Sequence, residues 1–324
     1  MKSTALFVLA TFLSVGPCTA AFPAQDHEFT REVPVSGPVL LEATTVAGGV
    51  TVTVGAAGRV TVTGSLHLRP NFGGMQVTAA DLERLRKDPP VHAVGNVVTL
   101  APIADERLRR AVAITFDVTV PYDTEVRVKT ESGRISIRGL KGPVAAQSES
   151  GGVEVADVQG GVAATTGSGA IRVLGIGGDV SADSGSGDVD MDGLEGAVTA
   201  HTQSARIRAR MRGAGAADVS SGSGTIEITG ARGPLVARTE SSTIHIDGVP
   251  GGDWGAESGS GKIAVRIPAG AAFSLEARSK SGRVRSGHPL EPGGVDEQRR
   301  VEGRVNGGGA KVALVTRSSA IAVE

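Results

Sequence analysis

The sequence predicts an all-β protein folded as a right-handed parallel β-solenoid, with coils of about 18 residues stacked along one axis. A Ser followed by Gly or another small residue recurs at a nearly fixed spacing. Apolar, often β-branched residues alternate with polar ones on both sides of it, as in strands. The chain of 324 residues has 47 glycines and only 3% aromatic residues, which indicates frequent turns and a thin core.

The repeat is defined by the small residue after the serine, which we take as position zero. Serine precedes position zero every time, and the successive intervals are 18, 18, 18, 18, 19, 18, 19 and 21 residues. The zero positions are Gly133, Gly151, Gly169, Gly187, Ala205, Gly224, Ser242, Gly261 and Gly282. We expect successive repeats to stack at about 4.8 Å, with like strands pairing in parallel, and the crossover rule favours right-handed coiling.

Each repeat predicts two short strands, one on each side of the Ser-Gly turn. Ile or Val stands two residues after zero, and apolar residues stand seven and five before it, where Ala predominates at the second place. These positions are expected to face inward, including Trp254, the single tryptophan. The residue three before zero is always Ser or Thr, a hydroxyl column that can satisfy buried turn amides.

The pattern extends to both ends of the chain, near residues 41–50 and 312–323. Residues 64–115 interrupt it, and we interpret them as a cap or side excursion. Its charged segment Asp81–Asp88 is expected to form one or two helical turns, ended by Pro89. Residues 286–308 form a second, loop-like excursion. Residues 21–324 are therefore predicted to be a single solenoid domain.

The N-terminus has the features of a signal peptide, predicted as residues 1–20. Lys2 precedes the short apolar run Ala5–Val15, and cleavage after Ala20 would remove Cys18, the only cysteine. The alternative is a lipoprotein anchored through Cys18, although Pro17 is unusual before such a site. No other segment approaches ~20 consecutive apolar residues, so no transmembrane helix is expected after processing. The chain is predicted to be exported to the periplasm, cell surface or exterior.

The repeats SESGGVEV, TGSGAIRV, SGSGDVDM, SGSGTIEI and SGSGKIAV, preceded by VPYDTEVRVKTESGRI, resemble the bacterial "putative adhesin" domain family. This glycine-rich β-strand-repeat family of largely unknown function is similar to auto-transporter adhesin head domains. The resemblance covers roughly residues 39–324. It implies a secreted or envelope-associated β-solenoid and an adhesive role, and it offers no catalytic motif to transfer.

Charged residues occupy the outward positions and alternate in sign from Glu154 to Glu227, one per repeat. The same register places Asp188 beside Arg206 and Asp192 beside Arg210. We interpret this as a charge ladder that sets the strand register and keeps a flat sheet soluble. The alternative is a ligand-binding stripe, made of Arg206, Arg208, Arg210 and Arg212. Acidic neighbours offset these arginines and the net charge is −1, so no nucleic-acid partner is predicted.

Asp183, His201 and Ser220 stand four before zero on three consecutive repeats, which sets an acid, an imidazole and a hydroxyl in adjacent register. A hydrolase triad also needs an oxyanion hole and a pocket, which a flat solenoid face does not obviously supply. No G-x-S-x-G motif occurs. We therefore assign no catalytic residue.

The stretch SGSGDVDMDG, Ser184–Gly193, contains D-x-D-x-D-G, which is how a calcium loop begins. Such a loop needs Glu eleven residues after Asp188, where Thr199 stands. The histidines lack ligand spacing, and no nucleotide-binding loop is present. No metal, cofactor or cofactor-binding residue is predicted.

The predicted function is a non-enzymatic, exported structural or interaction protein of the bacterial envelope or surface, an adhesin. Its partner is expected to be a protein or surface ligand on a flat sheet face. The alternatives are a polysaccharide-active β-helix enzyme and an envelope-stress scaffold. An enzyme of that kind needs clustered carboxylates, whereas arginines separate the carboxylates here.

Overall fold

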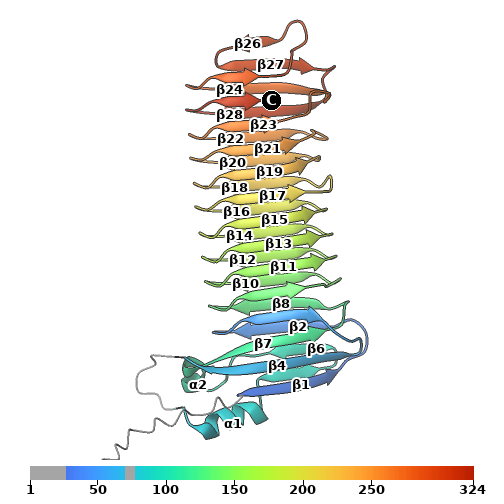
Figure 1. Cartoon of the computed structure of the whole chain (residues 1–324), viewed down its shortest axis with the longest axis vertical. Helices are drawn as coiled ribbons and strands as arrows, with labels where there is room; N and C mark the ends of the chain where they lie inside the picture. Colours follow the sequence, from blue (N-terminus) through green and yellow to red (C-terminus); the bar gives the residue numbers. More distant parts are fainter. Residues whose placement is uncertain (1–26, 70–76) are drawn as a thin grey trace, which may run out of the picture.

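The computed structural model describes residues 27–69 and 77–324, so the predicted signal peptide and Cys18 lie outside the described residues. Within these ranges the strands form two long sheets, of 14 and 15 strands, which we call sheet A and sheet B. The sheets run side by side along a rod, with the C-terminal strands at one end and two helices at the other (Figure 1).

The strands of sheet A, in spatial order, are β1 (Glu28–Pro34), β4 (Arg59–Leu68), β7 (Val112–Val120), β3 (Val50–Val54), β9 (Ile135–Arg138), β11 (Val153–Val158), β13 (Ile171–Ile176), β15 (Val189–Leu194), β17 (Ile207–Met211), β19 (Ile226–Ala231), β21 (Ile244–Gly248), β23 (Ile263–Arg266), β29 (Ile321–Val323) and β25 (Val284–Ser286). The strands of sheet B are β26 (Val295–Glu297), β27 (Arg300–Val305), β24 (Phe273–Ser279), β28 (Ala310–Thr316), β22 (Trp254–Ser258), β20 (Leu235–Thr239), β18 (Ala217–Ser221), β16 (Val198–Thr202), β14 (Val180–Ser184), β12 (Val162–Thr166), β10 (Val144–Ser148), β8 (Glu125–Thr130), β2 (Leu40–Thr45), β6 (Val97–Leu100) and β5 (Val91–Val94).

Each repeat of the main array supplies one strand to sheet B and the next to sheet A. Neighbouring coils pair in parallel and in the predicted register, for example Val153 with Ile171 and Val162 with Val180. The inward columns are buried because each lies between the two sheets. The predicted parallel β-solenoid, with two short strands per coil, is confirmed.

The hydroxyl column lies inside the rod and bonds to the turns. Thr166 accepts a hydrogen bond from the Gly169 N–H at 3.0 Å, and its Oγ1 donates to the Gly151 carbonyl of the preceding coil at 3.1 Å. The buried members of this column are Thr45, Thr130, Ser148, Thr166, Ser184, Thr202, Ser221, Thr239, Ser258, Ser279 and Thr316. Side chains thus satisfy turn amides that the coil-to-coil backbone ladder leaves unpaired.

The glycine at position zero is required by the close approach of adjacent turns. A Cβ on Gly187 would lie 1.8 Å from the carbonyl oxygen of Gly169 in the preceding coil. Where Ala205 replaces the glycine, its N–H reaches the Thr202 hydroxyl only at 3.4 Å, against 2.8 Å for Gly187 and Ser184. The extra carbon therefore loosens the turn locally, although the stack continues.

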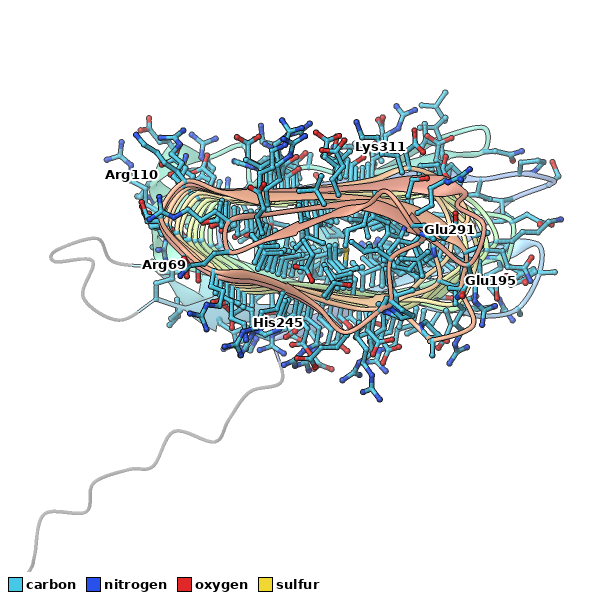
Figure 2. All side chains as sticks on the ribbon, turned by 90° about the horizontal axis from the view of Figure 1, so that it is seen from above. Arg69, Arg110, Glu195, His245, Glu291 and Lys311 are labelled. Atoms are coloured by element: carbon cyan, nitrogen blue, oxygen red, sulfur yellow. The ribbon has the colours of Figure 1, made fainter. Side chains whose placement is uncertain are left out.

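The core is a narrow layer between the sheets, seen along the axis in Figure 2, where labelled polar residues such as Lys311 and His245 point outward from opposite faces. Trp254 is 1% exposed, and its Nε1 donates to the Gly233 carbonyl at 2.9 Å. The prediction that Trp254 is a core residue is confirmed. Its indole replaces the smaller residues of its column without leaving the ring nitrogen unpaired.

The stacking order departs from the chain order at both ends, which corrects the expectation that every repeat stacks on its predecessor. The coil of β28 and β29 lies between the coil of β22 and β23 and that of β24 and β25. Gly282 consequently faces Ser319 rather than Gly261. At the other end, the coil of β2 and β3 lies between the strands β6 and β7 and the coil of β8 and β9.

Antiparallel strands and two helices cover the ends of the rod. Strands β4 and β1 continue sheet A beyond β7, and the hairpin of β26 and β27 lies on β24. Helix α1 (Ala79–Lys87) begins at Thr78 with a capping box to Asp81, and α2 (Glu106–Ala111) begins at Asp105. The Arg31 guanidinium donates to the Lys87 carbonyl and so links β1 to α1.

Candidate functional site

Asp183, His201 and Ser220 form a row on the outer face of sheet B, as the repeat predicts. Their backbones pair in adjacent register, Asp183 with His201 and His201 with Ser220. The His201 Nδ1 lies 3.0 Å from the Ser220 Oγ, in hydrogen-bond contact. Among the described contacts, none joins the Asp183 carboxylate to the imidazole. The structure therefore assembles two of the three groups that a triad needs.

The surroundings of this pair lack the other parts of a hydrolase. His201 is exposed, and it lines an open hollow with Ser220, Arg238, Glu240, Glu257 and Arg317. The backbone amides of these strands are used in the parallel ladders, so they are not free to stabilise an oxyanion. The pair can share a proton, but the described contacts offer it neither an acid partner for the imidazole nor an oxyanion hole.

The two arginines of this hollow were not singled out from the sequence. Arg238 follows Ser220 in the register and lies 3.5 Å from the Asp218 carboxylate. The spacing of the repeat would have identified it. Arg317 reaches the hollow only because the last coil is inserted beside β22, which no local pattern indicates.

The charge ladder lies on the outer face of sheet A. The Arg206 guanidinium contacts Asp188 at 3.0 Å, and that of Arg210 contacts Asp192 at 3.0 Å. Each pair joins neighbouring coils, and every one of these side chains stays between 44% and 54% exposed. The predicted pairing is confirmed, and the acids of SGSGDVDMDG are the partners of arginines on the next coil.

The central pair of the ladder differs from its neighbours. The Arg208 Nε donates to Glu227 at 3.0 Å, whereas its Nη1 lies 3.9 Å from Asp190. The hydrogen bond to Glu227 raises the pKa of Arg208 above its ordinary value. Arg208 is thus tied to the following coil more tightly than to the preceding one. The predicted stripe of arginines is largely neutralised along its length.

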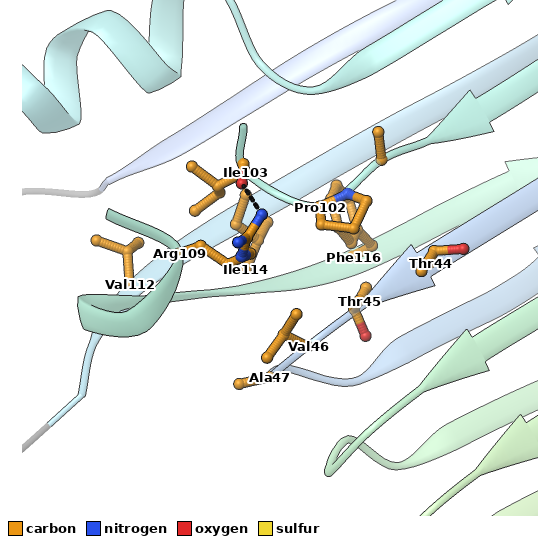
Figure 3. A pocket seen from close by; sticks show the side chains of 11 residues that line it. Thr44, Thr45, Val46, Ala47, Pro102, Ile103, Arg109, Val112, Ile114 and Phe116 are labelled. Carbon is orange, nitrogen blue, oxygen red and sulfur yellow. Dashed lines mark hydrogen bonds between the residues drawn. The ribbon is translucent and has the colours of Figure 1, made fainter. Parts of the chain in front are cut away.

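A small cavity lies where β2 meets the N-terminal cap (Figure 3). Its lining combines apolar side chains, such as Ile114 and Phe116, with Arg109, whose Nη1 donates to the Ile103 carbonyl at 3.4 Å. The cavity has a volume of about 20 Å³, which is room for one water molecule. It is a packing defect beside the cap rather than a site for an organic ligand.

Metal-binding and membrane-spanning features are considered within residues 27–69 and 77–324. In these ranges, no group of three or more His, Cys, Asp or Glu side chains is placed to hold a metal ion. No helix there has the length and apolar character needed to cross a membrane.

Two crystal structures similar to this chain are of proteins named for adhesion. "A putative cell adhesion protein from Clostridium sporogenes ATCC 15579" is 6% identical, with a TM-score of 0.22, and the match covers 92% of this chain and 99% of that one. "A putative adhesin" from Bacteroides fragilis NCTC 9343 is 12% identical, with a TM-score of 0.27, covering 91% and 95%. At these scores neither likeness adds to the description of the fold.

No curated protein matches the chain. One family model does, over residues 115–324, which takes in the array from β8 to β29 and most of β7. The likeness to auto-transporter adhesin heads stays a prediction, because the matching description names a domain of unknown function. On this match, the chain belongs to the Toastrack DUF4097 family.

Proposed function

We propose that this chain is a non-enzymatic, exported structural or interaction protein of the bacterial envelope or surface, acting as an adhesin. The observation that carries the proposal is the display of side chains along the rod. The fold constrains the inward columns and the turns, whereas each outward column presents one side chain per coil at about 4.8 Å spacing. Such a face suits a protein or an extended surface better than a small molecule.

Export is part of the same proposal. It is supported by the sequence of residues 1–20, which has the charge, apolar run and small residues of a signal peptide. Fractionation of cells that produce the chain, followed by N-terminal mass analysis, tests it. We expect a mature chain that begins at Ala21, whereas a diacylated Cys18 would indicate the lipoprotein alternative. Retention of the full chain in the cytoplasm would contradict export.

Adhesion is tested with beads coated with the purified chain and incubated with washed bacterial envelopes. We expect saturable attachment that soluble chain competes away, and beads coated with heat-unfolded chain are the control. Equal attachment of both kinds of bead would contradict a specific surface contact. A parallel screen for hydrolysis of polysaccharides should show no turnover, and turnover of any polysaccharide would favour the enzymatic alternative.

The contact between His201 and Ser220 is the observation that favours a hydrolase as the second candidate. A fluorophosphonate probe that labels activated serines gives a direct test. We expect no labelling of the folded chain. Labelling that disappears in Ser220→Ala but persists in Ser241→Ala, a serine of the same hollow, would establish Ser220 as a nucleophile.

A further inference from the structure

The outer face of sheet A carries a charge pattern that reverses about one line. On one side of the line three acids lie on or next to β15, and on the other side three arginines lie opposite them on or next to β17. In register, the opposed residues are Asp188 and Arg206, Asp190 and Arg208, and Asp192 and Arg210. Consider a two-fold axis that is parallel to the strands and lies over the line between β15 and β17. Rotation by 180° about this axis places the acidic positions of one copy over the basic positions of the other.

From this relationship, we propose that the outer face of sheet A binds a second copy of this chain. The two rods lie face to face and antiparallel, so that β15 of each copy lies over β17 of the other. Every acid of the central coils then faces an arginine of the second copy. Two-fold contacts of this isologous kind are the commonest in soluble oligomers. The proposal goes beyond the adhesive role and leaves sheet B free for another ligand.

The internal ion pairs do not have to break for the faces to meet. Asp188 and Arg206 already contact each other at 3.0 Å, and both side chains remain 44% exposed. When two such pairs meet antiparallel, the four charges form a square in which every neighbour has the opposite sign. One exposed ion pair adds little, but a network of pairs held in fixed geometry can determine the partner and the orientation.

The complementarity continues on the next coils. The same axis places β13 over β19, so that Arg172 faces Glu227 of the second copy. Within the described residues, Arg172 forms no ion pair of its own. One coil further, Glu154 faces His245. Small residues flank these charges on one side and permit close approach, namely Gly152, Ala170, Thr225 and Thr243.

The contact also has a defined limit. Extending it to β9 and β23 would set Arg134 against Lys262 and Arg138 against Arg266, which are like charges. The interface therefore spans six strands of each copy, from β11 to β21, or about 29 Å along the rod at the usual strand spacing. A patch of this size and polarity lies at the small end of specific interfaces. We expect a reversible dimer that weakens with salt.

Sedimentation velocity over a concentration series tests the association. At low ionic strength we expect a monomer–dimer equilibrium, and at about 1 M salt, where the Debye length falls to about 3 Å, we expect monomer. A chain that stays monomeric at about 200 μM and low salt would overturn the proposal. A dimer that is as tight in high salt would also overturn it, because the charge pattern would not be its cause.

The orientation is tested by a charge exchange that preserves the internal pairs. The variant D188R/D192R/R206D/R210D reverses the outer columns, whose flanking residues are uncharged: Ala170, Leu174, Thr225 and Thr229. The variant is expected to dimerise with itself as the original chain does. It should not mix with the original chain, since four like-charge contacts, made by eight side chains, would then replace the opposite-charge contacts across the interface.

Native mass spectrometry with one isotopically labelled partner measures this mixing. The matched control is D218R/R238D, which exchanges an ion pair on the opposite sheet and should mix statistically with the original chain. Statistical mixing of the sheet A variant would overturn the proposal. Should that variant not fold, Arg172→Glu replaces it, and we expect at least tenfold weaker dimerisation. Unchanged dimerisation of Arg172→Glu would contradict the predicted contact with Glu227.

Discussion

The hydroxyl of Ser184 accepts a hydrogen bond from the Gly187 N–H at 2.8 Å and joins its coil to the preceding one by donating to the Gly169 carbonyl at 3.3 Å. Because Ser184 is buried, Ser184→Ala leaves both backbone groups without this partner. We expect the free energy of unfolding to fall by about 1–2 kcal/mol, measured by urea denaturation.

The control for this prediction is Ser184→Thr, since Thr166 and Thr202 occupy the same column on the adjacent coils. It should change stability by no more than about 0.5 kcal/mol. If the alanine and threonine variants were equally stable, the hydroxyl column would be only a consequence of turn preference. The emission of the buried Trp254 reports the unfolding of the core in both cases.

Gly187→Ala tests the close approach of the turns. Its Cβ would lie 1.8 Å from a backbone oxygen, which a side-chain rotation cannot relieve. We expect a loss of about 1–3 kcal/mol in the free energy of unfolding. Ala205→Gly is the matched variant at a turn that already accommodates a Cβ, and it should stay within about 1 kcal/mol of the original chain. Equal effects at the two turns would contradict the proposed steric cause.

The period of 18 residues was sufficient to predict the strands, their register and the hydroxyl column, because one coil repeats one set of local requirements. It also brought His201 and Ser220 together correctly. The pattern cannot predict the order of the coils. Each coil presents the same columns to its neighbours, so the strands near Val312 and Ile321 fit between any two coils. The long excursion of residues 286–308 allows this insertion.

A periodic pattern also cannot predict which partner each charged side chain bonds. Register places Arg208 between Asp190 and Glu227, and only the side-chain geometry shows that its hydrogen bond goes to Glu227. The hypothesis that Asp183 belongs to a catalytic triad likewise depended on the orientation of its side chain, which the strand register does not specify. Periodicity determines which residues are neighbours, and rotamers determine which neighbours bond.

Asp157 offers a test of the left-handed backbone conformation found near the end of several sheet A strands. It has a φ of 56°, and its counterparts on the adjacent coils, Gly139 and Gly175, have φ values of 80° and 64°. Asp157→Gly should therefore be nearly neutral, within about 1 kcal/mol, because glycine adopts this conformation without steric cost. Asp157→Val should cost about 1–2 kcal/mol. Equal thermal midpoints for the two variants would show that the backbone at this position can relax.

Asp81 is expected to make the stability of the N-terminal cap depend on pH. The backbone N–H of Thr78 donates to its carboxylate, and Arg107 does so at 3.0 Å, so that the pKa of Asp81 lies far below its ordinary value. A carboxylate with a lowered folded-state pKa adds stability that is complete above the pKa of the unfolded chain, about 4. That contribution is lost as the pH falls toward the folded-state pKa.

Asp81→Asn isolates this contribution, because it keeps the shape of the side chain without the charge. We expect the variant to be less stable than the original chain at about pH 6, with the difference shrinking steadily below about pH 4. Urea denaturation at a series of pH values measures it. Glu83→Gln is the comparison: the hydrogen bond from Arg86 also lowers the pKa of Glu83, but this pair is exposed, so we expect a smaller difference. A difference between the Asp81 variant and the original chain that stays constant down to about pH 2 would mean that the carboxylate caps α1 by geometry alone, without its charge.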